Sequence, residues 1–140
     1  MTASTPSFPQ MRRLRVLIAD DDEQMRKLLV RLLSFDFEVV GSVPDGRELV
    51  KTAVSLAPDV IVSDIAMSGL TGPEAMDLLH AGGHRSTFVL ISANFRHVDE
   101  HLSRGAMALV HKIDIGSELS TAIRMAAMGQ TYVSRSVRLL

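Results

Sequence analysis

Residues 60–67 form a short run, Val-Ile-Val-Ser-Asp-Ile-Ala-Met, in which β-branched apolar side chains lead to a single carboxylate, Asp64. Such a run is typical of a strand that is buried on both faces in the middle of a parallel sheet. A carboxylate at the end of a buried strand is costly unless another group pairs with it. Because ligands of open α/β sheets bind outside the carboxyl ends of the strands, we expect chemistry at Asp64, although a strand-ending Asp can also cap a turn.

The alternation of strand and helix recurs along the chain. Apolar runs predict five strands, and patterns with helical periodicity predict the helices between them. The strands are expected at residues 14–19, 38–43, 60–64, 87–92 and 107–111, and the helices at 23–34, 47–57, 73–81, 97–104 and 118–128. We therefore predict an α/β fold of the flavodoxin-like, doubly wound (βα)5 kind, with a five-stranded parallel sheet in the order 2-1-3-4-5.

The composition excludes several classes of function. A net charge of −1 gives no overall field that favours nucleic acid or an anionic membrane. The lack of cysteine rules out disulfides, thiolate metal sites and a cysteine nucleophile. No apolar run approaches the roughly 18 residues of a membrane span, and no signal peptide precedes the first strand. We therefore expect a cytoplasmic protein that does not contact a membrane.

Polar side chains stand where four of the predicted strands end. These are Asp20 and Asp21 after strand one, Asp64 after strand three, Ser92 after strand four and Lys112 after strand five. In a parallel sheet these ends share one edge, so three carboxylates converge and their like charges conflict. A divalent cation removes the conflict, and oxygen ligands favour Mg²⁺, Ca²⁺ or Mn²⁺.

The remaining polar groups at this edge suit a phosphoryl group. Lys112 offers a point charge and Ser92 a hydroxyl donor, both of which phosphoryl oxygens accept. An Asp carboxylate such as Asp64 is a known nucleophile in aspartyl-phosphate chemistry. A metal, a lysine and a donor around a nucleophile are the usual parts of phosphoryl transfer.

On these residues the chain resembles a response regulator receiver domain of two-component signalling, over roughly residues 14–128. The matching motifs are Leu-Ile-Ala-Asp-Asp at 17–21, Val-Ser-Asp-Ile-Ala-Met at 62–67, Ile-Ser-Ala at 91–93, Gly-Ala at 105–106 and the strand end at Lys112. Residues 129–134 are similar to the NarL/FixJ-like class, in which this segment leads to a helix-turn-helix DNA-binding domain. The start of the chain is rich in Ser, Thr and Pro, so residues 1–11 are expected to form a flexible leader. The resemblance implies a receiver domain at 12–129, and at 130–140 a tail or the start of a linker to an output domain not present in this chain.

The resemblance also implies the site and its partners. It makes Asp64 the phosphoacceptor for a sensor histidine kinase, Ser92 the switch hydroxyl and Lys112 a phosphoryl contact. Mg²⁺, or alternatively Mn²⁺, would be held by Asp20, Asp21, Asp64 and the backbone carbonyl of Ala66. The chain would be a phosphoacceptor that assists its own phosphorylation and dephosphorylation rather than an enzyme. It would form a homodimer through the face of helix 4, strand 5 and helix 5, and would control transcription by contacting DNA only through the output domain.

Three positions depart from the family pattern: Ser68 and Ile113 replace residues that are usually Pro and Pro or Asp, and Leu109 replaces the switch aromatic. Ala66 offers no group to orient water, whereas Asn94 does, so we expect Asn94 to assist dephosphorylation. The departures leave open a degenerate receiver that acts as an unphosphorylated interaction module. An Asp-nucleophile phosphatase would need a second acid at Ala66. A nucleotide or flavin binder would need a Gly-rich loop after strand one, where four acids stand instead.

Overall fold

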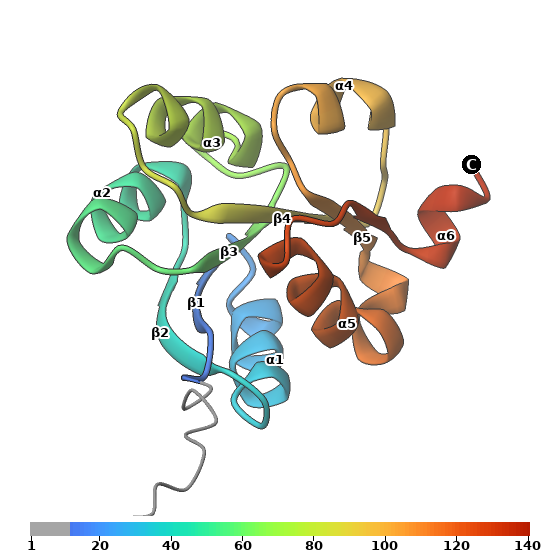
Figure 1. Cartoon of the computed structure of the whole chain (residues 1–140), viewed down its shortest axis with the longest axis horizontal. Helices are drawn as coiled ribbons and strands as arrows, with labels where there is room; N and C mark the ends of the chain where they lie inside the picture. Colours follow the sequence, from blue (N-terminus) through green and yellow to red (C-terminus); the bar gives the residue numbers. More distant parts are fainter. Residues whose placement is uncertain (1–11) are drawn as a thin grey trace, which may run out of the picture.

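The computed structural model describes residues 12–140, so the predicted leader at 1–11 lies outside the described residues. Strands and helices alternate as expected (Figure 1). In chain order they are β1 (Arg15–Ala19), α1 (Glu23–Leu33), β2 (Glu38–Val43), α2 (Gly46–Leu56), β3 (Val60–Asp64), α3 (Gly72–Ala81), β4 (Thr87–Ser92), α4 (Val98–Ser103), β5 (Ala108–His111), the 3-10 turn η1 (Lys112–Asp114), α5 (Ile115–Ala127), β6 (Tyr132–Val133) and α6 (Arg135–Arg138). Within the described chain, no helix is long and apolar enough to cross a membrane.

All strands of the sheet are parallel, and their order is β2-β1-β3-β4-β5-β6. The doubly wound fold and the order of the first five strands are confirmed. The predicted count of five strands is corrected to six, because β6 pairs with the outer edge of β5. A strand of two residues carries too little alternation to be recognised in a sequence. Helix α5 also begins earlier than predicted, at Ile115, directly after η1.

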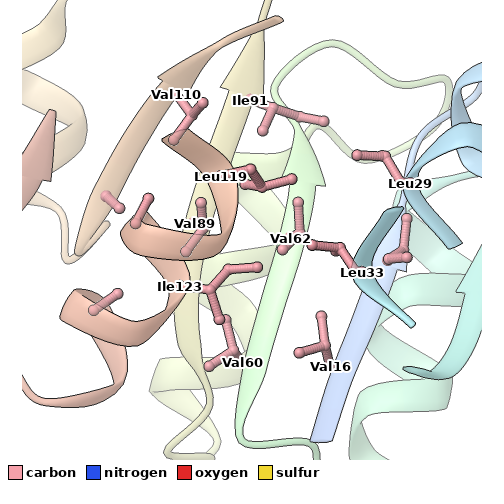
Figure 2. Close-up of a cluster of buried hydrophobic side chains, with 14 of the residues drawn as sticks. Val16, Leu29, Leu33, Val60, Val62, Val89, Ile91, Val110, Leu119 and Ile123 are labelled. Atoms are coloured by element: carbon pink, nitrogen blue, oxygen red, sulfur yellow. The ribbon is translucent and has the colours of Figure 1, made fainter. Parts of the chain in front are cut away.

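Two apolar layers hold the helices against the sheet. Helices α1 and α5 cover one face, where Val60 and Val62 of β3 meet Leu29, Leu33, Leu119 and Ile123 (Figure 2). Helices α2, α3 and α4 cover the other face, where Ile61 of β3 lies in a second cluster. The central strand is therefore fully buried, as its uninterrupted apolar run predicts.

Caps fix the loops that follow the strands at the functional edge. The side chain of Asp22 accepts a hydrogen bond from the Gln24 N–H at the start of α1. Thr71 and Glu74 form a capping box at the start of α3, with Pro73 in the first turn. Gly72 is required there because a Cβ would lie 2.3 Å from the carbonyl oxygen of Asp64. These contacts set the backbone on both sides of the acidic residues.

Candidate functional site

Three carboxylates meet at the carboxyl ends of β1 and β3. The two strands are neighbours, with Ala19 opposite Ser63, so Asp20 and Asp64 extend from adjacent strand ends. One carboxylate oxygen from each of Asp20, Asp21 and Asp64 lies within 4.8 Å of the other two. Asp20 is fully buried, Asp64 is 7% exposed and Asp21 faces solvent. The predicted convergence of acidic side chains is therefore present.

Backbone and side-chain contacts hold Asp20 in place. Its Oδ1 accepts a hydrogen bond from the Asp22 N–H at 2.9 Å, and its carbonyl oxygen accepts one from Arg26 Nη1 at 2.7 Å. Its Oδ2 is buried and has no hydrogen bond of good geometry. One oxygen of this carboxylate is thus fixed by the fold, and the other is directed into the acidic cluster.

Lys112 brings a positive charge to both buried acids. Its Nζ lies 3.0 Å from Asp20 Oδ2 and 3.2 Å from Asp64 Oδ2. Only the contact with Asp64 also has the geometry of a hydrogen bond, so Asp20 Oδ2 gains charge pairing without a directed donor. The cluster offers only oxygen atoms as metal ligands, and one of them, Asp20 Oδ2, is buried and accepts no hydrogen bond of good geometry. These features fit a hard divalent cation such as Mg²⁺.

The pKa values record the conflict between these charges. Burial raises the pKa of Asp64 above its ordinary value; the charge of Asp20 adds to the rise, and Lys112 opposes it without cancelling it. For Lys112, burial alone would lower the pKa, but the two carboxylates outweigh burial and raise it. Lys112 is therefore held in its charged form, beside Asp64, whose ionised form is disfavoured by burial.

The remaining predicted residues surround this cluster. The Ala66 N–H donates to Asp64 Oδ1 at 3.3 Å, and both Ala66 and Ser68 are exposed in the loop after β3. Ser92 is the last residue of β4, one position beyond Ile91, which lies opposite Asp64. Its Oγ accepts a hydrogen bond from the Asn94 N–H at 3.0 Å, and Asn94 itself is exposed.

Leu109 lies away from the acids, fully buried in β5. It belongs to the second apolar cluster, which also contains Phe95 from the loop after β4. Aromatic rings are thus present in that cluster, but they come from Phe88 of β4 and from Phe95 of the loop rather than from β5. Sequence reasoning missed Phe95 because it stands in a predicted loop, and it missed Arg26 because an arginine in a helix is usually a solvated residue.

The comparisons with known proteins agree with this geometry. Residues 16–124 match the family model of the response regulator receiver domain. The chain is 33% identical over 129 residues to the transcriptional regulatory protein LiaR of Bacillus subtilis (strain 168), which covers 89% of this chain and 61% of LiaR. It is 30% identical over 126 residues to the nitrate/nitrite response regulator protein NarL of Escherichia coli (strain K12), which covers 87% of this chain and 58% of that protein.

Among solved structures, the signal receiver domain of the response regulator NarL from Mycobacterium tuberculosis has a TM-score of 0.81 at 28% identity, covering 85% of this chain and 99% of that one. The chain spans about three fifths of the length of the two curated relatives. Because the family model covers residues 16–124, well over half of the sequence, this chain belongs to the response regulator receiver domain family and is similar to the LiaR and NarL regulators.

Proposed function

We propose that this chain is a phosphorylation-switched receiver of a two-component system, in which Asp64 accepts a phosphoryl group from a sensor histidine kinase. The observation that carries the proposal is the position of Asp64, buried at the end of β3 with Lys112 Nζ at 3.2 Å and two further carboxylates within 4.8 Å. The burial of Asp64 and the nearness of two other carboxylates both cost stability, because burial and like charges disfavour the ionised acid. In a receiver domain, this arrangement serves to bind a cation and to accept a phosphoryl group.

In the proposed reaction an Asp64 oxygen attacks the phosphorus of the donor. The bond between phosphorus and the donor nitrogen or oxygen breaks, and the donor leaves with the electron pair and takes up a proton. Lys112 favours the ionised, nucleophilic form of Asp64 and remains beside the transferred oxygens. Asp20, Asp21, Asp64 and the carbonyl of Ala66 would hold Mg²⁺, or alternatively Mn²⁺, which supplies charge neutralisation at the phosphoryl group.

The signal would leave through the segment after β4. A phosphoryl group on Asp64 adds negative charge and attracts the hydroxyl of Ser92. Residues 93–104 follow Ser92 directly, and Leu109 packs in the cluster beneath them. We expect amide exchange to change within residues 93–112, and a change confined to the loop between Asp64 and Gly72 would contradict this route.

The partners follow from the same proposal. A histidine kinase supplies the phosphoryl group in the cytoplasm, and a homodimer forms through α4, β5 and α5. DNA would be contacted only through an output domain. The relative LiaR is named a transcriptional regulatory protein, which suggests such a domain there. The chain itself acts as a phosphoacceptor and not as an enzyme with a separate substrate.

The decisive experiment is incubation with acetyl phosphate and Mg²⁺, followed by intact mass measurement. We expect the mass increase of one phosphoryl group, lost in EDTA and absent in Asp64→Asn. Asp36→Asn is the matched control, because Asp36 is a partly exposed acid that pairs with Arg124 far from the cluster. An adduct of ordinary yield in Asp64→Asn would contradict the assignment of the acceptor.

The second candidate is a degenerate receiver that serves as an unphosphorylated interaction module. The observation in its favour is the buried Leu109 in place of an aromatic residue, together with the 76% exposed Ile113 directly after Lys112. The same experiment separates the two functions, since a degenerate receiver would give no adduct while still binding its partner.

A further inference from the structure

The C-terminal segment, residues 130–140, covers the outer edge of the sheet. Its strand β6 pairs with β5, with the Ser134 N–H donating to the Leu109 carbonyl at 2.9 Å. Helix α6 follows and inserts Val137, 3% exposed, into the second apolar cluster beside Leu109 and Phe95. The edge of β5 is therefore occupied by the chain's own residues.

One buried carboxylate anchors this segment. Asp114 accepts hydrogen bonds from Ser134 Oγ at 2.7 Å, from the Ser136 N–H at 2.8 Å and from Ser136 Oγ at 2.9 Å. Ser134 is fully buried, and its Oγ also accepts a hydrogen bond from the His111 N–H at 2.9 Å. The anchor thus joins the segment to both sides of residue 112.

A second acid makes contacts of the same kind one turn further along α5. Glu118 accepts a hydrogen bond from the hydroxyl of Tyr132 at 2.6 Å, and its two oxygens lie 3.1 and 3.2 Å from the N–H of Arg135. Like Asp114, it belongs to the η1–α5 stretch that begins at Lys112. The segment is consequently attached to the element that carries the lysine of the acidic cluster.

This attachment links the acidic cluster to the sheet edge through very few bonds. Lys112 contacts Asp20 and Asp64 with its side chain. On one side of it, the neighbouring His111 N–H donates to Ser134 Oγ, and on the other side only Ile113 separates it from Asp114. His111 also lies opposite Ser92 in the pairing of β4 with β5. A shift of Lys112 or of Ser92 is therefore felt by the groups that hold residue 134.

We propose that residues 130–140 are a displaceable cover of the β5 edge, released when a phosphoryl group on Asp64 moves Lys112 and Ser92. The inference rests on the proposed function of Asp64. The Lys112 ammonium exchanges its contact with Asp20 Oδ2 for a phosphoryl oxygen, and the peptide groups of residues 111–114 move with it. Release uncovers Leu109 and the polar backbone groups of β5, and it frees α6 to move with any chain joined to it.

Hydrogen exchange of the full chain, read by mass spectrometry, tests both the anchor and its coupling. In Ser134→Ala we expect exchange across residues 131–139 to become roughly 5–30-fold faster, as for the loss of about 1–2 kcal/mol of local stability. Ser34→Ala is the matched control, because the exposed Ser34 hydroxyl donates to the Val30 carbonyl at the C-terminal end of α1. Both variants should keep the protection of β1 and β3.

The coupling is tested by adding beryllofluoride and Mg²⁺, or acetyl phosphate and Mg²⁺, to the unmodified chain. We expect residues 131–139 to lose protection as they do in Ser134→Ala. Unchanged protection in a sample whose mass proves the phosphoryl adduct would overturn the coupling and leave the function of Asp64 intact. Absence of any adduct would overturn the proposed function and the coupling together, and unchanged protection in Ser134→Ala would overturn the anchor.

Discussion

Two buried carboxylates stand on either side of Lys112 in this fold, and their surroundings are opposite. Asp64 has a raised pKa, because burial and the charge of Asp20 outweigh the help of Lys112. Asp114 has a lowered pKa: burial alone would raise it, but hydrogen bonds from Ser134 and Ser136 outweigh burial. Hydrogen bonds stabilise the charge of Asp114, so this acid contributes to the stability of the fold. The charge of Asp64 is poorly compensated, which suits the binding of a cation or a phosphoryl group.

The largest expected effect concerns the backbone around the two acids. In Gly72→Ala the new Cβ would meet the Asp64 carbonyl oxygen at 2.3 Å and Ser63 Oγ at 2.8 Å, so β3 or α3 must shift. We expect a loss of about 1–3 kcal/mol or more in the free energy of unfolding, measured in urea. Gly116→Ala, near Asp114 in α5, meets nothing within 4 Å and should be neutral or stabilising by up to about 1 kcal/mol. Equal stabilities for the two variants would show that the acceptor loop is not tightly packed.

Replacing the satisfied acid should also destabilise the protein. Asp114→Asn removes the charge that its serine and backbone donors stabilise, and hydrogen bonds to a charged group contribute about 1.5–3 kcal/mol. We expect a loss on that scale in urea unfolding without metal. Asp36→Asn, at a partly exposed ion pair with Arg124, should change stability by less than about 1 kcal/mol. A neutral Asp114→Asn would remove the contrast between the two acids.

Much of the acidic edge could be predicted from the sequence. Its residues follow apolar runs that are recognisable locally, and a parallel sheet must bring the carboxyl ends of its strands together. The structure places Asp20, Asp21 and Asp64 within 4.8 Å of one another and Lys112 against two of them. The functional roles of these residues remain predictions.

The anchor of the C-terminal segment could not be predicted in the same way. Asp114 looks like an ordinary acid beside Lys112, and its donors, Ser134 and Ser136, stand about twenty residues later. Their contact depends on α5 folding back along the sheet and on β6, which is two residues long. Tertiary contacts of this kind leave no periodic pattern in the sequence.

Replacing the acid in conflict should have the opposite sign. Asp64→Asn removes a buried charge that burial and Asp20 disfavour, so in EDTA we expect the variant to melt at a higher temperature than the wild type. With Mg²⁺ the difference in melting temperature should become smaller or change sign, because a ligand at 100 times its Kd stabilises the wild type by about 2.7 kcal/mol. A lower melting temperature for Asp64→Asn in EDTA would mean that Lys112 overcomes the conflict.

The pH dependence of unfolding sharpens the same contrast. The pKa of Asp64 is raised in the fold, so without metal the wild type should lose stability as the pH rises from 3.8 through that raised value. The advantage of Asp64→Asn over the wild type should therefore grow across that window. The pKa of Asp114 is lowered, so its contribution is present above 3.8 and is lost as the pH falls through the lower folded value. Parallel stability curves for the wild type and Asp64→Asn would contradict the raised pKa.

The smallest expected effect is kinetic and lies at the exposed rim of the acidic edge. Asn94 contacts Ser92 only through its backbone N–H, so its exposed amide side chain is free to orient water near an acyl phosphate. In Asn94→Ala we expect the phosphoryl adduct to last longer by less than about tenfold, which corresponds to about 1.4 kcal/mol in the barrier. The adduct lifetime is read by intact mass after removal of acetyl phosphate, with Asp99→Asn, at an exposed acid of α4, as the control. The backbone contact with Ser92 survives the substitution, so the folded stability should stay unchanged while only the lifetime moves. An unaltered lifetime would assign hydrolysis to water that no side chain of this loop orients.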